Sequence, residues 1–166
     1  LAEFVDNSTQ SFYDHKDELL STKYYKGLEV EIDYTEDPFV GDEIVIRDNA
    51  YGMDYRDFQR AIILDRPPEN TKGRNEFGMG LKAAACWFGN LWSVETTCLG
   101  SNVKYKTTID IDSLIKYKNE EIEVEEETVN PKEHYTIIKI QRLNKKIKGK
   151  RIEKNIHELL SSIYRA

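Results

Sequence analysis

Two polar side chains near the start of the chain have the types and the spacing for phosphate chemistry. Glu3 and Asn7 lie four residues apart in a stretch without glycine or proline, and on a helix this spacing places both side chains on one face. An amide oxygen can ligate Mg²⁺, and a carboxylate can orient or deprotonate a water that attacks a phosphate. Such pairs occur in many helices, so the alternative is two solvated polar residues.

An acidic residue follows a short apolar segment further along the chain. Asp48 comes directly after residues 43–47, and the turn behind it contains Gly52 and Met53. A carboxylate in that place could accept a hydrogen bond from an exocyclic amine such as that of adenine, while Met53 packs on the ring. The alternative is an ordinary turn, because Asp, Asn and Gly are common turn residues.

A glycine-containing stretch precedes an apolar segment with helical character. Gly78 and Gly80 flank Met79, and Leu81 and Lys82 follow at once. Glycines let backbone N–H groups approach a ligand closely, and the free amides at a helix N-terminus attract anions. Lys82 could add a positive charge. The stretch is not a Walker A motif, which would need Gly-Lys-Ser/Thr after four spacer residues.

Hydrophobic periodicity around these three stretches predicts helices mostly early and strands mostly late, with hairpin-like connections. This order favours an α+β sandwich, with helices on one face of a mixed, mainly antiparallel sheet. Asp54 is the expected N-cap of the second helix. The expected helices span residues 1–20, 54–62, 81–88 and 150–164, the expected strands span residues 28–34, 43–47, 91–98, 103–110, 122–129 and 135–143, and residues 65–75 form a loop.

Composition limits the class of protein. The 166 residues are 39% hydrophobic and 33% charged, which excludes a disordered chain and fits a single domain over residues 1–166, expected to be part of a longer protein. No apolar run approaches the roughly 20 residues that span a bilayer, so we expect no membrane partner. Cys86 and Cys98 suit neither a disulfide framework nor a zinc site, and we therefore expect a cytoplasmic protein.

Charge is spread unevenly along the chain. The formal net charge is −6, yet residues 139–166 hold nine basic and two acidic residues. A basic C-terminal segment on an acidic body could contact nucleic acid or a protein partner. The alternative is a helix with a solvated basic face.

The three stretches, taken together and in this order, resemble the GHKL ATPase superfamily, which covers DNA gyrase-type topoisomerases, large heat-shock chaperones, histidine kinases and MutL. The resemblance is nearest to MORC-type and chaperone-type domains. It covers nearly the whole chain, because the late strand-like segment around Thr136 is similar to the family's strand that bears a nucleotide-site threonine. The segments that carry it are residues 2–8 (AEFVDNS), 48–53 (DNAYGM), 77–82 (FGMGLK) and 135–140 (YTIIKI).

The resemblance implies a Bergerat-type fold that binds ATP with Mg²⁺, and it implies a role for each matching residue. Glu3 would be the general base that positions water, and Asn7 would ligate Mg²⁺. Asp48 would accept from the adenine amino group, supported through water by Thr136. The remaining cofactor-binding residues would be Gly52 and Met53 at the base, Gly78, Met79, Gly80, Leu81 and Lys82 at the phosphates, and residues 65–76 as an ATP lid.

The implied activity is slow ATP hydrolysis that drives a conformational or dimerisation switch in a larger protein. Turnover by this chain alone is expected to be slow, because many relatives use a lysine from a following domain. Two departures from the family pattern are Ala50, where a glycine is usual, and Gln10, where chaperone relatives often have an acid.

Two other functions compete with this interpretation. One is the catalytic domain of a histidine kinase, and the other is a nucleotide-binding scaffold without turnover. A general base such as Glu3 favours turnover over a scaffold. None of the histidines (His15, His134 and His157) has the context of a phosphoacceptor, and we expect all of them on the surface.

Overall fold

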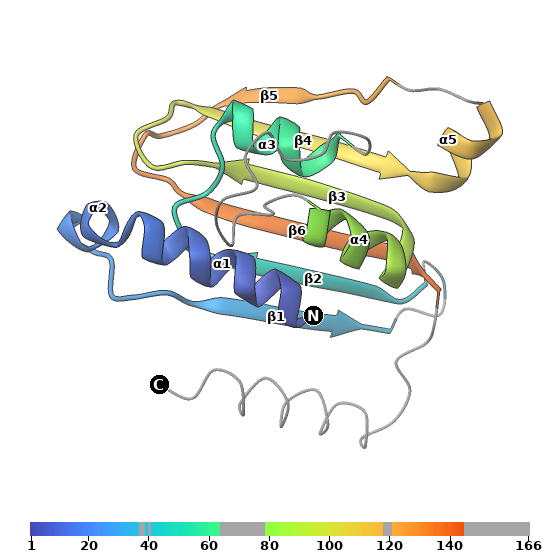
Figure 1. Cartoon of the computed structure of the whole chain (residues 1–166), viewed down its shortest axis with the longest axis horizontal. Coiled ribbons are helices and arrows are strands. Elements are labelled where there is room, and N and C mark those ends of the chain that lie inside the picture. Colours follow the sequence, from blue (N-terminus) through green and yellow to red (C-terminus); the bar gives the residue numbers. More distant parts are fainter. Residues whose placement is uncertain (37–38, 40, 64–78, 118–120, 145–166) are drawn as a thin grey trace, which may run out of the picture.

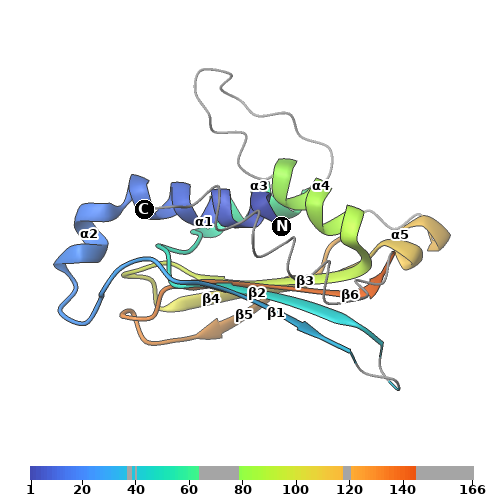
Figure 2. The same cartoon turned by 90° about the horizontal axis from the view of Figure 1, so that it is seen from below.

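The chain folds into two layers, a six-stranded sheet with helices on one of its faces (Figure 1 and Figure 2). The computed structural model describes residues 1–36, 39, 41–63, 79–117 and 121–144. The expected α+β sandwich is confirmed. The elements are α1 (Ala2–Asp14), α2 (Lys16–Ser21), β1 (Val30–Thr35), β2 (Glu43–Asp48), α3 (Tyr55–Ile62), α4 (Met79–Phe88), β3 (Gly89–Thr97), β4 (Val103–Asp110), α5 (Ile111–Tyr117), β5 (Glu125–Thr128) and β6 (Tyr135–Leu143).

The last described strand, β6, lies in the middle of the sheet. The strand order is β1-β2-β6-β3-β4-β5, and every pairing between neighbouring strands is antiparallel. The register places Thr136 of β6 opposite both Asp48 of β2 and Thr96 of β3. Three polar residues from distant parts of the sequence therefore form one row across the sheet.

The hydrophobic core lies between the sheet and the helix layer. Alternate residues of the central strands point into it, as the period of two predicts, and they include Trp92, Ile138 and Ile140. Phe4 of α1 and Phe58 of α3 reach the same core from the other layer, and both are fully buried. This packing fixes the two helices over the sheet.

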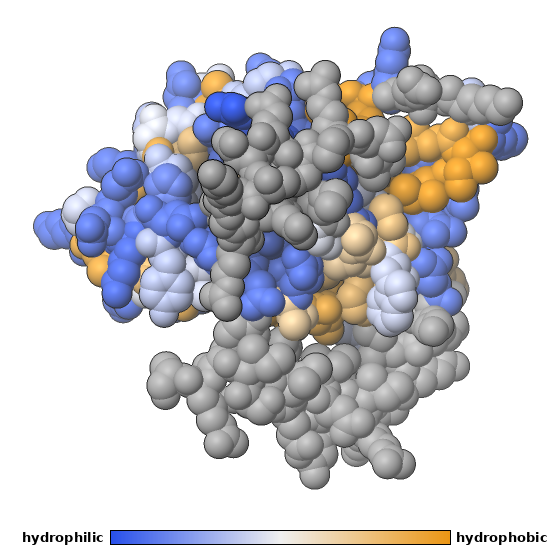
Figure 3. All heavy atoms as spheres, in the orientation of Figure 1, coloured by the Kyte–Doolittle hydropathy of each residue, from blue (hydrophilic) through white to orange (hydrophobic). Residues whose placement is uncertain are grey.

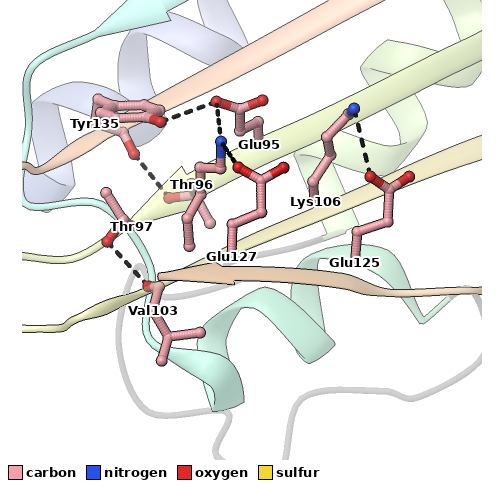
Figure 4. Close-up of polar contacts among 9 residues, drawn as sticks. Glu95, Thr96, Thr97, Val103, Lys106, Glu125, Glu127 and Tyr135 are labelled. Atoms are coloured by element: carbon pink, nitrogen blue, oxygen red, sulfur yellow. Dashed lines mark hydrogen bonds and ion pairs between the residues drawn. The ribbon is translucent and has the colours of Figure 1, made fainter. Parts of the chain in front are cut away.

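The opposite face of the sheet carries charged and polar side chains that pair across strands (Figure 4). Tyr135 donates a hydrogen bond of 2.9 Å to Glu95, and Lys106 lies 3.6 Å from Glu125. On the same face, Arg47 pairs with Asp33 at 2.5 Å. The described helices cover only one face, and these pairs give the other face its polar character.

Several expected boundaries hold and others shift. β4 and β6 have the predicted bounds, and Asp54 caps α3 by accepting a hydrogen bond from the backbone N–H of Asp57. The expected continuous helix over residues 1–20 is wrong, because the backbone leaves helical geometry at His15 (φ −122°, ψ 22°). The ring of His15 stacks on Tyr51 there, a tertiary contact that local periodicity cannot predict.

The region after β4 also differs from the prediction. Helix α5 was not predicted, although Asp110 caps it by accepting from the backbone N–H of Ser113. The strand expected over residues 122–129 shortens to β5, because Ile122 and Val124 pack against the core outside the ladder. Residues 150–164 of the expected last helix, most of the basic segment and the loop over residues 65–75 lie outside the described residues.

Candidate functional site

A groove of about 170 Å³ runs between α1 and α3, with the sheet as its floor. One stripe of α1 forms one wall, α3 and the turn before it form the other, and Leu81 of α4 also lines the groove. The groove is lined by Phe4, Asn7, Ser8, Ser11, Asp14 and His15, by Gly52, Met53, Asp57, Arg60 and Ala61, by Asp48, Thr136 and Ile138, and by Leu81.

Asp48 lies on the floor of the groove with its carboxylate held from two sides. Oδ2 accepts a hydrogen bond of 2.7 Å from the Ser8 hydroxyl on α1, and Oδ1 accepts one of 3.0 Å from the backbone N–H of Ala50. The backbone of Thr136 contributes a further hydrogen bond. A carboxylate has about four acceptor positions, so these three donors leave about one for a ligand.

Burial raises the pKa of Asp48 above its usual range, because an apolar environment disfavours the charged form. The hydrogen bonds from Ser8, Ala50 and Thr136 act in the other direction, as does the nearby His134. His134 is positioned by its own contact, since Nδ1 lies 2.7 Å from the carbonyl oxygen of Ala50. The carboxylate is thus desolvated yet supplied with donors, as a site for an amine donor would be.

Thr96 connects the row of polar residues across the sheet to Met53 in the wall of the groove. Its hydroxyl donates to the carbonyl oxygen of Tyr135 at 2.9 Å and accepts from the backbone N–H of Met53 at 3.0 Å. The hydroxyl oxygen of Thr136 lies 3.1 Å away. Thr96 is fully buried, and it therefore fixes the position of Met53 relative to Thr136.

Gly52 is required by the turn that follows Asp48. Its φ of 81° favours glycine, and a Cβ there would overlap the carbonyl group of Thr97. Ala50, in contrast, needs no glycine, because Arg142 is the only non-glycine residue with positive φ in the described part of the chain. The methyl group of Ala50 is buried, and its backbone serves both Asp48 and His134.

Glu3 and Gly80 meet where α1 and α4 come together. A Cβ on Gly80 would overlap the Glu3 carboxylate, so the absence of a side chain at residue 80 lets Glu3 lie against the first turn of α4. Glu3 is exposed and lies beside the groove, whereas Asn7 and Leu81 line it. Met79 is the first residue of α4, and Gly78 lies outside the described residues.

Lys82 points toward α3. Its ammonium group donates a hydrogen bond to the carbonyl oxygen of Ile63, the residue that follows α3. The side chain is buried and is not part of the groove wall. Lys82 therefore ties the first turn of α4 to the end of α3.

The comparison with protein families bears on this geometry. Residues 1–149 match the family described as histidine kinase-, DNA gyrase B- and HSP90-like ATPases. The chain belongs to this ATPase family. The match covers every described helix and strand, and it indicates an ATP-binding domain. A comparison with curated proteins gave no match.

The ATPase domain brings together residues that the motifs did not reveal. Ser8, Ser11, Asp14 and His15 extend the stripe that begins at Phe4 and Asn7, so helical spacing from Asn7 could have found them. His15, expected on the surface, keeps 37% of its side chain exposed and also lines the groove, with its ring 3.7 Å from that of Tyr51. His134 is half-buried and lies behind Asp48. No local pattern marked Thr96, Asp57 or Arg60.

The described residues of the ATPase domain contain no group of three or more His, Cys, Asp or Glu that could hold a metal ion. A single amide ligand suits Mg²⁺, which keeps several waters and usually binds one or two protein oxygens together with substrate phosphates. Asn7, in the groove wall, fits that role. Within the described ranges, no helix is long and apolar enough to cross a membrane.

Asp48→Asn tests the cost of burying the carboxylate. The amide can donate to Ser8, because the Ser8 hydroxyl can donate instead to the Phe4 carbonyl oxygen, 3.0 Å away. The pKa of Asp48 is higher in the folded state than in the unfolded state. The folded state therefore loses stability as the pH rises above the pKa of the unfolded state. We expect Asp48→Asn to raise the melting temperature at neutral pH, with a gain that shrinks as the pH is lowered.

Thermal melts over a series of pH values measure this difference. Asp17→Asn, at an exposed acid on α2, is the matched control and is expected to change little. A lower melting temperature for Asp48→Asn at neutral pH would mean that the hydrogen bonds to the carboxylate outweigh its desolvation.

Proposed function

We propose that this domain binds Mg·ATP in the groove between α1 and α3 and hydrolyses it slowly. The observation that carries the proposal is the Asp48 carboxylate on the groove floor, with three hydrogen-bond donors and about one acceptor position left. An exocyclic amine of adenine supplies the missing donor. Met53, whose backbone is held by Thr96, lies in the wall beside it and would pack on the base.

The phosphates would extend toward the N-terminal end of α4. Backbone amides of the first helical turn are free to bind anions, and Gly78, Met79, Gly80 and Leu81 belong to that stretch or to the residues just before it. The ion Mg²⁺ would neutralise phosphate charge, with Asn7 as its protein ligand. In this arrangement Lys82 supports the wall of the site through Ile63.

Glu3 is the proposed general base. Its carboxylate lies against Gly80, one helical turn from Asn7, so a water near the terminal phosphate would be within its reach. Within a longer cytoplasmic protein, ATP binding would act as a conformational switch that favours a homodimer. The basic segment of residues 139–166 would then be available to nucleic acid or to an acidic protein.

Nucleotide binding is the first test of the proposal. We expect ATP with Mg²⁺ to raise the melting temperature of the wild type, because a ligand at 100 times its dissociation constant stabilises the folded state by about 2.7 kcal/mol. Asp48→Asn should weaken binding roughly tenfold or more, since it replaces a charge-assisted acceptor. Calorimetric titration measures both, with Asp17→Asn as the control. The absence of binding to folded wild type would refute the proposal.

Measurements of ATP turnover and ATP affinity distinguish the role of Glu3 from that of Asn7. Glu3→Gln should lower the rate of phosphate release about 100-fold or more, the usual range for loss of a general base, with ATP affinity within a few-fold of the wild type. Asn7→Ala should instead weaken Mg²⁺-dependent binding. Asp17→Asn, at an exposed acid on α2, is the control. An equal loss of affinity in Glu3→Gln and Asn7→Ala would assign Glu3 a structural role only.

A further inference from the structure

Arg60 lies in the last turn of α3, and its side chain lines the groove. Among the described residues that line it, Arg60 is the only lysine or arginine, whereas Asp14, Asp48 and Asp57 each contribute a carboxylate. A nucleotide brings several further negative charges on its phosphates. Arg60 is therefore the one wall residue whose permanent charge suits the anionic part of that ligand.

The position of Arg60 along the groove matches the phosphate end. Three residues further on, Ile63 accepts a hydrogen bond from Lys82 in the first turn of α4, so the end of α3 adjoins the start of α4. The same first turn of α4 contacts Glu3 through Gly80. Arg60 thus lies at the end of the groove where a helix N-terminus and the proposed base converge.

The present partner of Arg60 holds it only weakly. Its guanidinium pairs with the Asp57 carboxylate one turn earlier on the same helix. The two side chains are 55% and 44% exposed, and exposed pairs of this kind contribute little net stability. A phosphate offers the planar guanidinium two acceptor oxygens with more charge, so exchange of one partner for the other is favourable.

We propose that Arg60 leaves Asp57 and binds the phosphate chain when the nucleotide enters the groove. Asp57 then serves as a resting partner that keeps the guanidinium in the wall. This assignment rests on the proposed function, since it concerns the same site. It differs from the sequence-based expectation, in which Lys82 was the basic residue at the phosphates.

Titrations of Arg60→Met with ATP, ADP and adenosine test the assignment. We expect roughly tenfold weaker binding of ATP and ADP, the range for a hydrogen bond to a charged group, and unchanged binding of adenosine, which has no phosphate. Arg56→Met is the matched control, because Arg56 lies on the same helix but does not line the groove. Circular dichroism and melting curves establish that each variant folds.

Asp57→Asn supplies an independent readout. Loss of the competing carboxylate should leave ATP binding at least as tight as in the wild type, because Arg60 no longer has to give up an ionic partner. If Asp57→Asn weakens ATP binding as much as Arg60→Met does, the pair supports α3 structurally and the assignment is wrong.

The outcomes separate this assignment from the function it rests on. Binding of ATP to the wild type together with equal affinities of wild type and Arg60→Met would overturn the role of Arg60 alone. An equal loss of adenosine and ATP affinity in Arg60→Met would also overturn it, because the change would then act on the whole groove. Failure of the wild type to bind ATP or adenosine would overturn both proposals.

Discussion

The hydrogen bonds of the Asp48 carboxylate join the two layers of the domain at the bottom of its groove. Ser8 reaches the carboxylate from α1, Ala50 from the turn behind β2, and Thr136 from the neighbouring strand β6. Each donor comes from a different element, so the helix layer and the sheet must keep their relative positions for the carboxylate to stay satisfied. Burial of this charge is the constraint around which the groove is built.

The rest of the site follows from the elements that meet this constraint. The central place of β6 puts Thr136 between Asp48 and Thr96, and Thr96 in turn holds Met53. Gly52 gives the chain the tight turn between these contacts. At the other end of the groove, Lys82 ties α4 to α3, and Gly80 leaves room for Glu3. The two glycines thus mark the places where another group approaches the backbone closely, a carbonyl group at Gly52 and a carboxylate at Gly80.

Much of this fold was readable from the sequence, because hydrophobic alternation sets β4 and β6 and the Asp54 cap sets the start of α3. Gly52 and Gly80, where a Cβ would overlap a neighbouring group, were both among the predicted site residues. What local patterns could not show is which distant residues share a row of the sheet. Thr96 is one such residue, since its role depends on the register of β3 with β6.

The break at His15 and the partner of Lys82 have the same origin. A helical pattern gives no reason for α1 to end where His15 meets Tyr51, and a lysine behind two glycines gives no sign that its ammonium group faces Ile63. The first depends on how the end of α1 meets the turn after β2, and the second depends on how α4 packs beside α3. Side-chain types predicted the chemistry of the site, and tertiary contacts determine which of those side chains line it.

The preference of the groove for one nucleotide base over another tests the central claim most directly. Inosine triphosphate has the same sugar and phosphates as ATP, but it carries a carbonyl oxygen where adenine carries its amine. Against the Asp48 carboxylate that oxygen would place two acceptors together, so calorimetric titration should show ATP bound at least 100-fold more tightly than inosine triphosphate, as for sites that lose a buried hydrogen-bond partner. Equal affinities for the two nucleotides would contradict the account, because the buried carboxylate would then play no part in recognition of the base.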